Sequence, residues 1–209
     1  MIGYHTALAY HGKLNSLRND YIFLNKGTSP PVFAFRNLEF KAVSYPINLI
    51  KHNKESYGVE TKDHLGHKIL VTNLERTLVD VLDRPTLLGD WEEIWKSLES
   101  IGYLDVDKVI HYLFLLRNKT TIAKVGFFLE SHKEEFQISE NKLDKMLKHC
   151  PMKPLYINKQ SKQPYELISR WNIIVPESII NKVWEEPYGD IVRNINKRIR
   201  RNRFSSRNS

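Results

Sequence analysis

The amino-acid sequence predicts an α+β fold in which a short helix and a β-sheet are followed by a bundle of helices. Residues 20–46 are rich in aromatic and branched side chains, and apolar positions alternate with polar ones in a pattern typical of strands. Residues 86–150 instead place apolar side chains three and four positions apart, which is the period of amphipathic helices. With 41% hydrophobic and 27% charged residues, the 209-residue chain has the composition of an ordinary globular protein.

The first elements expected are a short helix in HTALAYHG and strands in YIFL and VFAFRNLEFKAV. A polar insert, NLIKHNKES, follows them. A hairpin is then expected around residues 63–66, because aspartate and glycine suit a turn between two short strands. The second strand of this hairpin runs directly into the next helix.

After Pro85 the sequence predicts four helices, in WEEIWKSLESIG, VDKVIHYLFLLRN, TIAKVGFFLESHKEEF and SENKLDKMLKHC. Gly126 lies inside the third of them and is expected where a neighbouring helix approaches closely. The single cysteine, Cys150, has no partner for an internal disulfide and is expected in the core. Two strands, PLYIN and ISRWNIIVP, are expected before a basic tail.

Trp171, in the last of these strands, has two interpretations. Together with Arg170 it could form a stacking surface for single-stranded nucleic acid. Burial is the favoured interpretation, because Ile173 and Val175 share its face of the expected strand.

The excess positive charge of the chain lies in its last residues. The formal net charge is +8, but residues 191–209 hold seven basic side chains and no acidic one, which leaves 25 basic and 24 acidic residues elsewhere. Six of them are candidates for contacts to nucleic-acid phosphates: Arg193, Lys197, Arg198, Arg200, Arg201 and Arg203. Such a tail is expected to bind nucleic acid weakly by releasing counterions, and its alternative role is a solvated terminus. We therefore expect a globular domain over residues 1–187 and a basic tail over residues 188–209.

The stretch TNLERTLVDVLDRP runs from Thr72 to Pro85. A capping box is expected at its start, in which the Thr72 hydroxyl accepts a hydrogen bond from the N–H of Glu75 and the Glu75 carboxylate accepts one from the N–H of Thr72. Pro85 disfavours helical geometry in the residue before it, and Asp83 supports a turn there. The stretch is therefore expected to form a helix that begins at Thr72 and ends near Pro85.

Three charged residues of this helix, Arg76, Asp80 and Arg84, fall four positions apart on one face. They are expected to form a solvated ladder of ion pairs opposite an apolar stripe. A catalytic role would need a nucleophile in the same stretch, and none is present. The charged residues are therefore expected to be structural.

The string ERTLVDVLDRP, preceded by a strand that ends in Val-Thr, resembles the signature of the AbiEi family, the antitoxins of type IV toxin–antitoxin and abortive-infection systems. HTALAYHG, AKVGFFLE and SRWNIIVPE resemble three further segments of that family, in the same order along the chain. The resemblance implies a non-enzymatic antitoxin domain that counters a cognate nucleotidyltransferase-like toxin, usually without forming a stable complex with it. Family members normally begin with a winged-helix DNA-binding domain that represses their own operon, and this chain begins where that domain would have ended. A transcriptional regulator or DNA-binding protein of the same operon is the alternative.

A nuclease is a less favoured alternative. Asp20 precedes Glu39-Phe-Lys41, and two carboxylates with a lysine can hold Mg²⁺ and activate water in restriction-type nucleases. Short motifs of this kind also arise by chance in strands with charged solvent-facing residues. The histidines show no ligand spacing and no glycine-rich phosphate loop is present, so neither a metal nor another cofactor is expected.

No apolar run approaches the roughly 18 residues that a membrane span requires. The amino-terminal residues also lack the basic-then-apolar order of a signal peptide. A cytoplasmic protein with no membrane partner is therefore expected.

Overall fold

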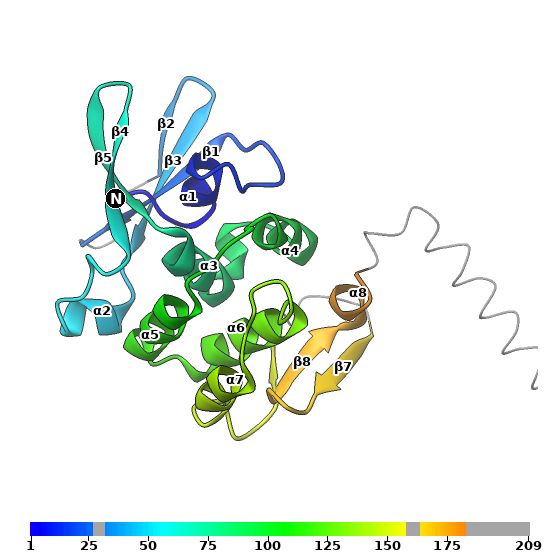
Figure 1. Ribbon diagram of the computed structural model, residues 1–209. Helices are drawn as coiled ribbons and strands as arrows, with labels where there is room; N and C mark the ends of the chain where they lie inside the picture. The colour runs from blue at the N-terminus through cyan, green and yellow to red at the C-terminus, as the bar shows by residue number, and fades with distance from the viewer. Residues whose placement is uncertain (27–31, 158–163, 183–209) are drawn as a thin grey trace, which may run out of the picture.

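Strands at the amino-terminal end of the chain and a small sheet near the other end flank a group of helices (Figure 1). This arrangement, seen in a computed structural model, is the α+β fold that the sequence predicts. The structure describes residues 1–26, 32–157 and 164–182. The six basic tail residues from Arg193 to Arg203 therefore lie outside the described residues.

The amino-terminal elements, in chain order, are α1 (Tyr4–Tyr10), β1 (Asp20–Asn25), β2 (Phe33–Phe35), β3 (Leu38–Ser44), α2 (Ile47–Lys51), β4 (Val59–His64) and β5 (His67–Thr72). β3 lies between β1, to which it is parallel, and β2, to which it is antiparallel. β4 and β5 form the predicted hairpin, in which Asp63 Oδ1 accepts a hydrogen bond of 3.1 Å from the N–H of Gly66. Ile2 forms bridges to Phe23 and Val71 and so joins the two groups of strands.

Helix α2 lies within the segment that was expected to be a polar insert. It follows Pro46, whose φ of −52° already suits the start of a helix. Leu49 is fully buried in the main hydrophobic core, and α2 packs on α5. Burial of this one side chain anchors an otherwise polar stretch, because most of the stability of a short helix comes from packing.

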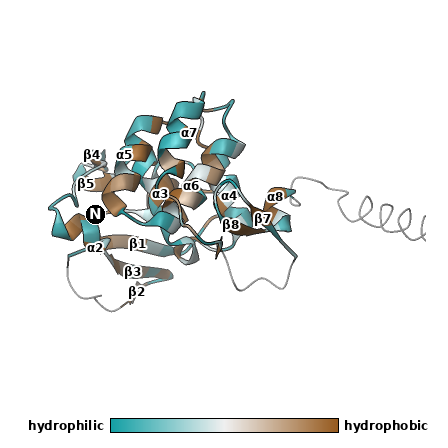
Figure 2. Ribbon diagram, turned by 90° about the horizontal axis from the view of Figure 1, so that it is seen from below, coloured by the Kyte–Doolittle hydropathy of each residue, from teal (hydrophilic) through white to brown (hydrophobic). Residues whose placement is uncertain are grey.

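The remaining helices are α3 (Leu74–Asp83), the 3-10 turn η1 (Pro85–Leu87), α4 (Trp91–Glu99), α5 (Val106–Leu116), α6 (Lys119–Ser131), α7 (Glu140–Leu147) and α8 (Glu177–Ile180). The four helices predicted after Pro85 are confirmed as α4 to α7. α4, α5 and α6 each begin at a side chain that accepts a hydrogen bond from the first turn, namely Asp90, Asp105 and Asn118. Figure 2 shows the outward side of α7 as hydrophilic, as expected for a helix that buries only one face. Among the described residues, no helix combines the length and the apolar character needed to cross a membrane.

The last sheet contains β6 (Leu155–Tyr156), β7 (Tyr165–Ile168) and β8 (Ile173–Pro176), with β8 in the middle. The prediction of one continuous strand in ISRWNIIVP was wrong. The segment is a hairpin in which β7 turns into the antiparallel β8, and Asn172 adopts a left-handed φ of 50° in the turn. Asparagine tolerates this conformation better than most residues. The alternation of apolar residues on which the prediction rested gives no sign of such a turn.

Trp171 lies in that turn and is fully buried, which confirms its predicted place in the core. Its ring lies against Gly126 in α6, where a Cβ atom would overlap the ring carbons. The close approach expected at Gly126 is therefore real, but a tryptophan from the β7–β8 turn makes it rather than a neighbouring helix. Arg170 is bound by the carboxylates of Glu130 and Glu140, so Arg170 and Trp171 do not form an open stacking surface.

Candidate functional site

The start of α3 differs by one residue from the predicted capping box. Asn73, not Thr72, is the N-cap, and its Oδ1 accepts a hydrogen bond of 3.0 Å from the N–H of Arg76. Thr72 is the last residue of β5, and its N–H already donates to the carbonyl of Ile2 over 3.1 Å. The Glu75 carboxylate instead accepts a hydrogen bond of 3.2 Å from the N–H of Asp105, before α5. The capping box does not form because the N–H of Thr72, which it requires, is already paired with the carbonyl of Ile2.

The charged face of α3 is buried, so the expected solvated ladder was wrong. Arg76 is 0% and Asp80 1% exposed, and the Arg76 Nε lies 3.2 Å from Asp80 Oδ2. Arg76 Nη1 also donates to the carbonyl oxygens of Glu55 at 2.6 Å and Tyr57 at 2.7 Å. The pair therefore fastens the segment before β4 to the central helix.

Arg84 does not continue this ladder. α3 ends at Asp83, and Arg84 has left helical geometry, with φ of −126° and ψ of 68°. Its Nη1 donates instead to the carbonyl of Ser44 at the end of β3, over 3.0 Å. The i to i+4 spacing that would join Arg84 to Asp80 is therefore lost.

Asp80 receives a second hydrogen bond from outside its helix. The Tyr112 hydroxyl of α5 donates to Asp80 Oδ1 over 2.6 Å. Burial raises the pKa of Asp80, and the Arg76 guanidinium and the Tyr112 hydroxyl oppose that rise. Burial alone would lower the pKa of Arg76, but the Asp80 carboxylate raises it. Each partner thus favours the charged form of the other, and the two residues form an enclosed ion pair.

Aromatic rings cover this ion pair. The ring of Tyr112 is stacked on that of Tyr57 with centroids 5.8 Å apart, and the Arg76 guanidinium carbon lies 5.2 Å from the centroid of Tyr112. Gly58 comes next to Tyr57 with a positive φ of 64°, and a Cβ there would lie 2.9 Å from Asn73 Oδ1. The four-residue spacing indicated the pairing of Arg76 with Asp80, but the tyrosines that complete the network come from separate segments and no local pattern links them to it.

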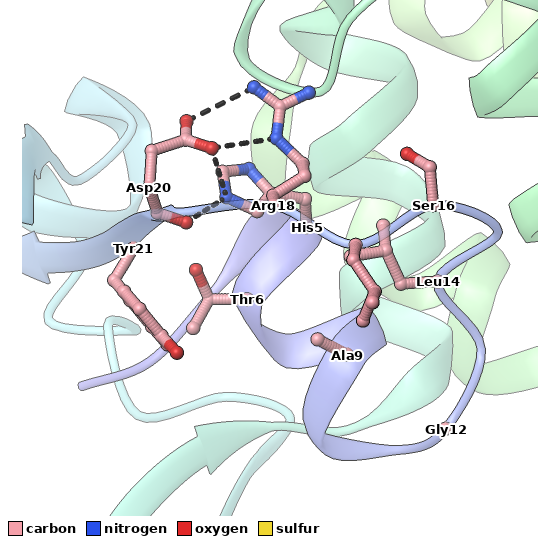
Figure 3. A pocket seen from close by; sticks show the side chains of 10 residues that line it. His5, Thr6, Ala9, Gly12, Leu14, Ser16, Arg18, Asp20 and Tyr21 are labelled. Atoms are coloured by element: carbon pink, nitrogen blue, oxygen red, sulfur yellow. Dashed lines mark hydrogen bonds and ion pairs between the residues drawn. The ribbon is translucent and has the colours of Figure 1, made fainter. Parts of the chain in front are cut away.

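A cleft of about 270 Å³ lies beside α1 and the start of β1 (Figure 3). The His5 ring lies between two carbonyl oxygens, that of Leu87, 3.0 Å from Nδ1, and that of Asp20, 2.8 Å from Nε2. Arg18 binds the Asp20 carboxylate through Nε at 2.7 Å and Nη2 at 3.1 Å. These contacts connect α1 and β1 to the end of η1.

The charges of this cleft are already paired. The hydrogen bond from Arg18 lowers the pKa of Asp20, with smaller contributions from the charges of His5 and Arg18. Arg18 also donates to the carbonyl of Leu88 and lies 3.6 Å from the Glu93 carboxylate. Each ionic group of the cleft therefore has a protein partner, and such an arrangement is typical of contacts that hold elements of a fold together.

The structure places the three residues of the nuclease alternative on neighbouring strands. Glu39 is paired in register with Asp20, and Lys41 is paired with Ile22. Glu39 and Lys41 are exposed, whereas Asp20 is held by Arg18. Within the part of the chain that the structure describes, no group of three or more His, Cys, Asp or Glu side chains is arranged to hold a metal ion.

No protein-family model and no curated protein matches this chain. The crystal structure of the RV2827C protein from Mycobacterium tuberculosis is similar in structure, with a TM-score of 0.57 and 11% sequence identity. The similarity covers 89% of this chain and 66% of that chain, so this chain spans just under two thirds of its length. At this level of identity the likeness concerns the fold alone.

Proposed function

We propose that this chain is an antitoxin of a type IV toxin–antitoxin, or abortive phage infection, system that counters a nucleotidyltransferase-like toxin. It acts without catalysing a reaction and without a cofactor. It forms no stable complex with the toxin, and its basic tail adds weak, non-specific affinity for nucleic acid.

The main support is the spatial arrangement of the four segments that resemble the AbiEi family. These segments are far apart in sequence, yet α1 packs on α3, α3 packs on α6, and α6 packs on β8. They form one connected centre of the molecule.

Hydrogen bonds between residues of these segments link each neighbouring pair. His11 at the end of α1 binds the carbonyl of Thr72 over 2.8 Å, and Lys124 of α6 donates to the carbonyl of Leu82 in α3 over 3.1 Å. The Trp171 indole donates to the Glu130 carboxylate over 2.5 Å. Residues of these segments are thus in direct contact, as expected of segments that build one structural core.

Co-expression with the neighbouring nucleotidyltransferase-like toxin tests the proposal. Cells that produce toxin and this protein should resume growth, whereas cells that produce toxin alone should not. Failure of rescue by protein that circular dichroism shows to be folded would remove the proposal.

Two measurements separate the alternatives. Purified protein with Mg²⁺ or Mn²⁺ should not cut DNA, and cutting that Lys41→Ala abolishes would support the nuclease instead. Sequence-specific binding to the promoter of its own operon, without rescue from the toxin, would favour the regulator.

A further inference from the structure

A second cleft, of about 390 Å³, lies where the start of α2, the end of α3 and the α5–α6 turn meet. It is separate from the cleft beside α1. Three cationic side chains line it, each from a residue outside regular helix or in a first helical turn: Arg84, Arg117 and Lys119. The apolar part of its lining includes Ile47, which is 61% exposed, and Leu116.

The three cations are available to a ligand to different degrees. Arg117 and Lys119 are exposed, and within the described part of the chain neither side chain forms an ion pair. Arg84 is held in place because its Nη1 donates to the carbonyl of Ser44, and its side chain remains 34% exposed. The cleft thus combines one fixed guanidinium with two free cationic groups.

One carboxylate, that of Asp83, lies in the same cleft, but its oxygens are already engaged. Asp83 Oδ1 accepts hydrogen bonds from Asn118 Nδ2 at 2.9 Å and from the Thr121 hydroxyl. Its Oδ2 lies 3.7 Å from Arg84 Nε, and the side chain is only 11% exposed. One enclosed negative charge therefore faces three positive ones.

The amino end of α6 does not supply the anion affinity. Asn118 Oδ1 already accepts from the N–H groups of Thr120 at 3.1 Å and Thr121 at 3.5 Å. The anion affinity comes from the side-chain charges around the cleft. A planar guanidinium binds two oxygens of a phosphate at once, and an ammonium adds a strong point charge.

We propose that this cleft binds the phosphate group of a nucleotide, with Arg84, Arg117 and Lys119 as the cationic contacts. Its volume of about 390 Å³ exceeds the space that a phosphate alone requires and falls in the roughly 300 to 1,000 Å³ range of small-ligand sites. The exposed Ile47 side chain provides an apolar wall for the sugar or base. The nucleotide is either free or part of a single strand, and the phosphate chemistry is the same.

The test uses the full chain and two pairs of substitutions. Arg117→Asn with Lys119→Ala removes two cations of the cleft. Asparagine suits position 117, because Arg117 has a left-handed φ of 53° that asparagine tolerates. Lys68→Ala with Lys153→Ala is the matched control, since it removes two exposed lysines on β5 and before β6. Both variants retain the tail, so the tail contributes equally to each.

The first measurement titrates ATP into ¹⁵N-labelled wild-type protein. Amide shifts should concentrate at Asn48, Arg84 and residues 116–120. ATP should bind the cleft variant at least about tenfold more weakly than wild type, because charge-assisted hydrogen bonds are lost, and should bind the control variant with unchanged affinity. Equal loss in both variants, or shifts spread evenly over the surface, would overturn the proposal. The wild-type shift map shows where ATP binds even if a variant fails to fold.

A second arm distinguishes the two sources of the phosphate. A short fluorescein-labelled single strand is titrated at several salt concentrations and its anisotropy is followed. For a strand, the slope of log K against log salt should flatten by about 1.4 in the cleft variant, at roughly 0.7 for each lost contact. ATP binding with an unchanged strand slope identifies a free nucleotide as the ligand. No loss with either probe rejects the site.

Nucleotide binding at this cleft does not depend on antitoxin activity, and different experimental outcomes would contradict each proposal. A cleft variant that no longer binds ATP but still rescues cells would leave both the phosphate site and the antitoxin proposal standing as independent properties. A wild-type protein that binds ATP at the cleft but never rescues cells would remove only the antitoxin proposal.

Discussion

The hydroxyl of Tyr112 in α5 donates a hydrogen bond of 2.6 Å to the carboxylate of Asp80 in α3, and both side chains are almost wholly enclosed. The carboxylate therefore connects three separate parts of the chain, through Tyr112 on one side and through Arg76 to the segment at residues 55–57 on the other. Substitutions in this network should act on stability.

Asp80→Asn should destabilise the protein by roughly 3 to 5 kcal/mol, because it leaves the Arg76 guanidinium buried without a counter-charge. Asp144→Asn removes the same charge from an exposed carboxylate, 3.6 Å from Arg170, and should have little effect. Urea denaturation of the two variants measures the difference. If Asp80→Asn unfolds at the wild-type urea concentration, the pair is not structural; loss of rescue from the toxin by that same variant would then indicate a direct functional role.

Asn73→Ala should lower stability by about 1 kcal/mol, because the N–H of Arg76 loses the acceptor that caps α3. Asn73→Asp retains a capping oxygen and should stay within a few tenths of a kcal/mol of wild type. Thermal melts followed by circular dichroism compare them. Equal loss in both variants would mean that Asn73 acts other than through its cap.

Gly126→Ala should destabilise the protein by about 1 to 3 kcal/mol, because the new methyl group would overlap the ring of Trp171 and force the β7–β8 turn outward. Gly102→Ala is the control, since no heavy atom lies within 4 Å of a Cβ at that position. Urea denaturation gives the stabilities, and the near-ultraviolet circular dichroism difference between each variant and wild type reports a change around the tryptophans, Trp171 included. An unchanged spectrum together with full stability would show that the contact can relax at no cost.

Cys150 should react slowly with iodoacetamide in the folded protein. Burial raises the pKa of its thiol from 9.0 to about 11, so the thiolate fraction at pH 8 falls roughly a hundredfold. The rate should recover in urea, where burial is lost. Comparable rates in the two states would place the thiol in water.

Glu140 should titrate far below the usual range. Hydrogen bonds from Arg170, and then from Lys133, lower its pKa from 4.5 to about 2. Because the folded-state pKa is depressed, the stabilisation it provides is present above about pH 4.5 and is lost as the pH falls toward 2. Carboxyl ¹³C NMR measures the pKa, and Arg170→Met should return it toward 4.5.

Local sequence patterns were sufficient to predict the fold class and the helices from α4 to α7. Apolar spacing of three and four residues depends only on helical geometry, and so do the aspartate and asparagine caps that begin α4, α5 and α6. The hairpin around residues 63–66 was equally local. The buried place of Trp171 also followed from the sequence, although its contact with Gly126 did not.

Only the tertiary structure decided where the charges of the central motif lie. The spacing of Arg76, Asp80 and Arg84 in the sequence would place them on one face of a continuous helix, and an isolated helix would leave all three in water. Arg76 and Asp80 are instead enclosed: Arg76 Nη1 donates to the carbonyls of residues 55 and 57, and Asp80 accepts from the hydroxyl of Tyr112, all from outside the helix. Arg84 turns away from Asp80 toward Ser44 at the end of β3. It lines the second cleft together with Arg117 and Lys119. Such contacts join residues tens of positions apart, and a periodic pattern within one helix carries no information about them.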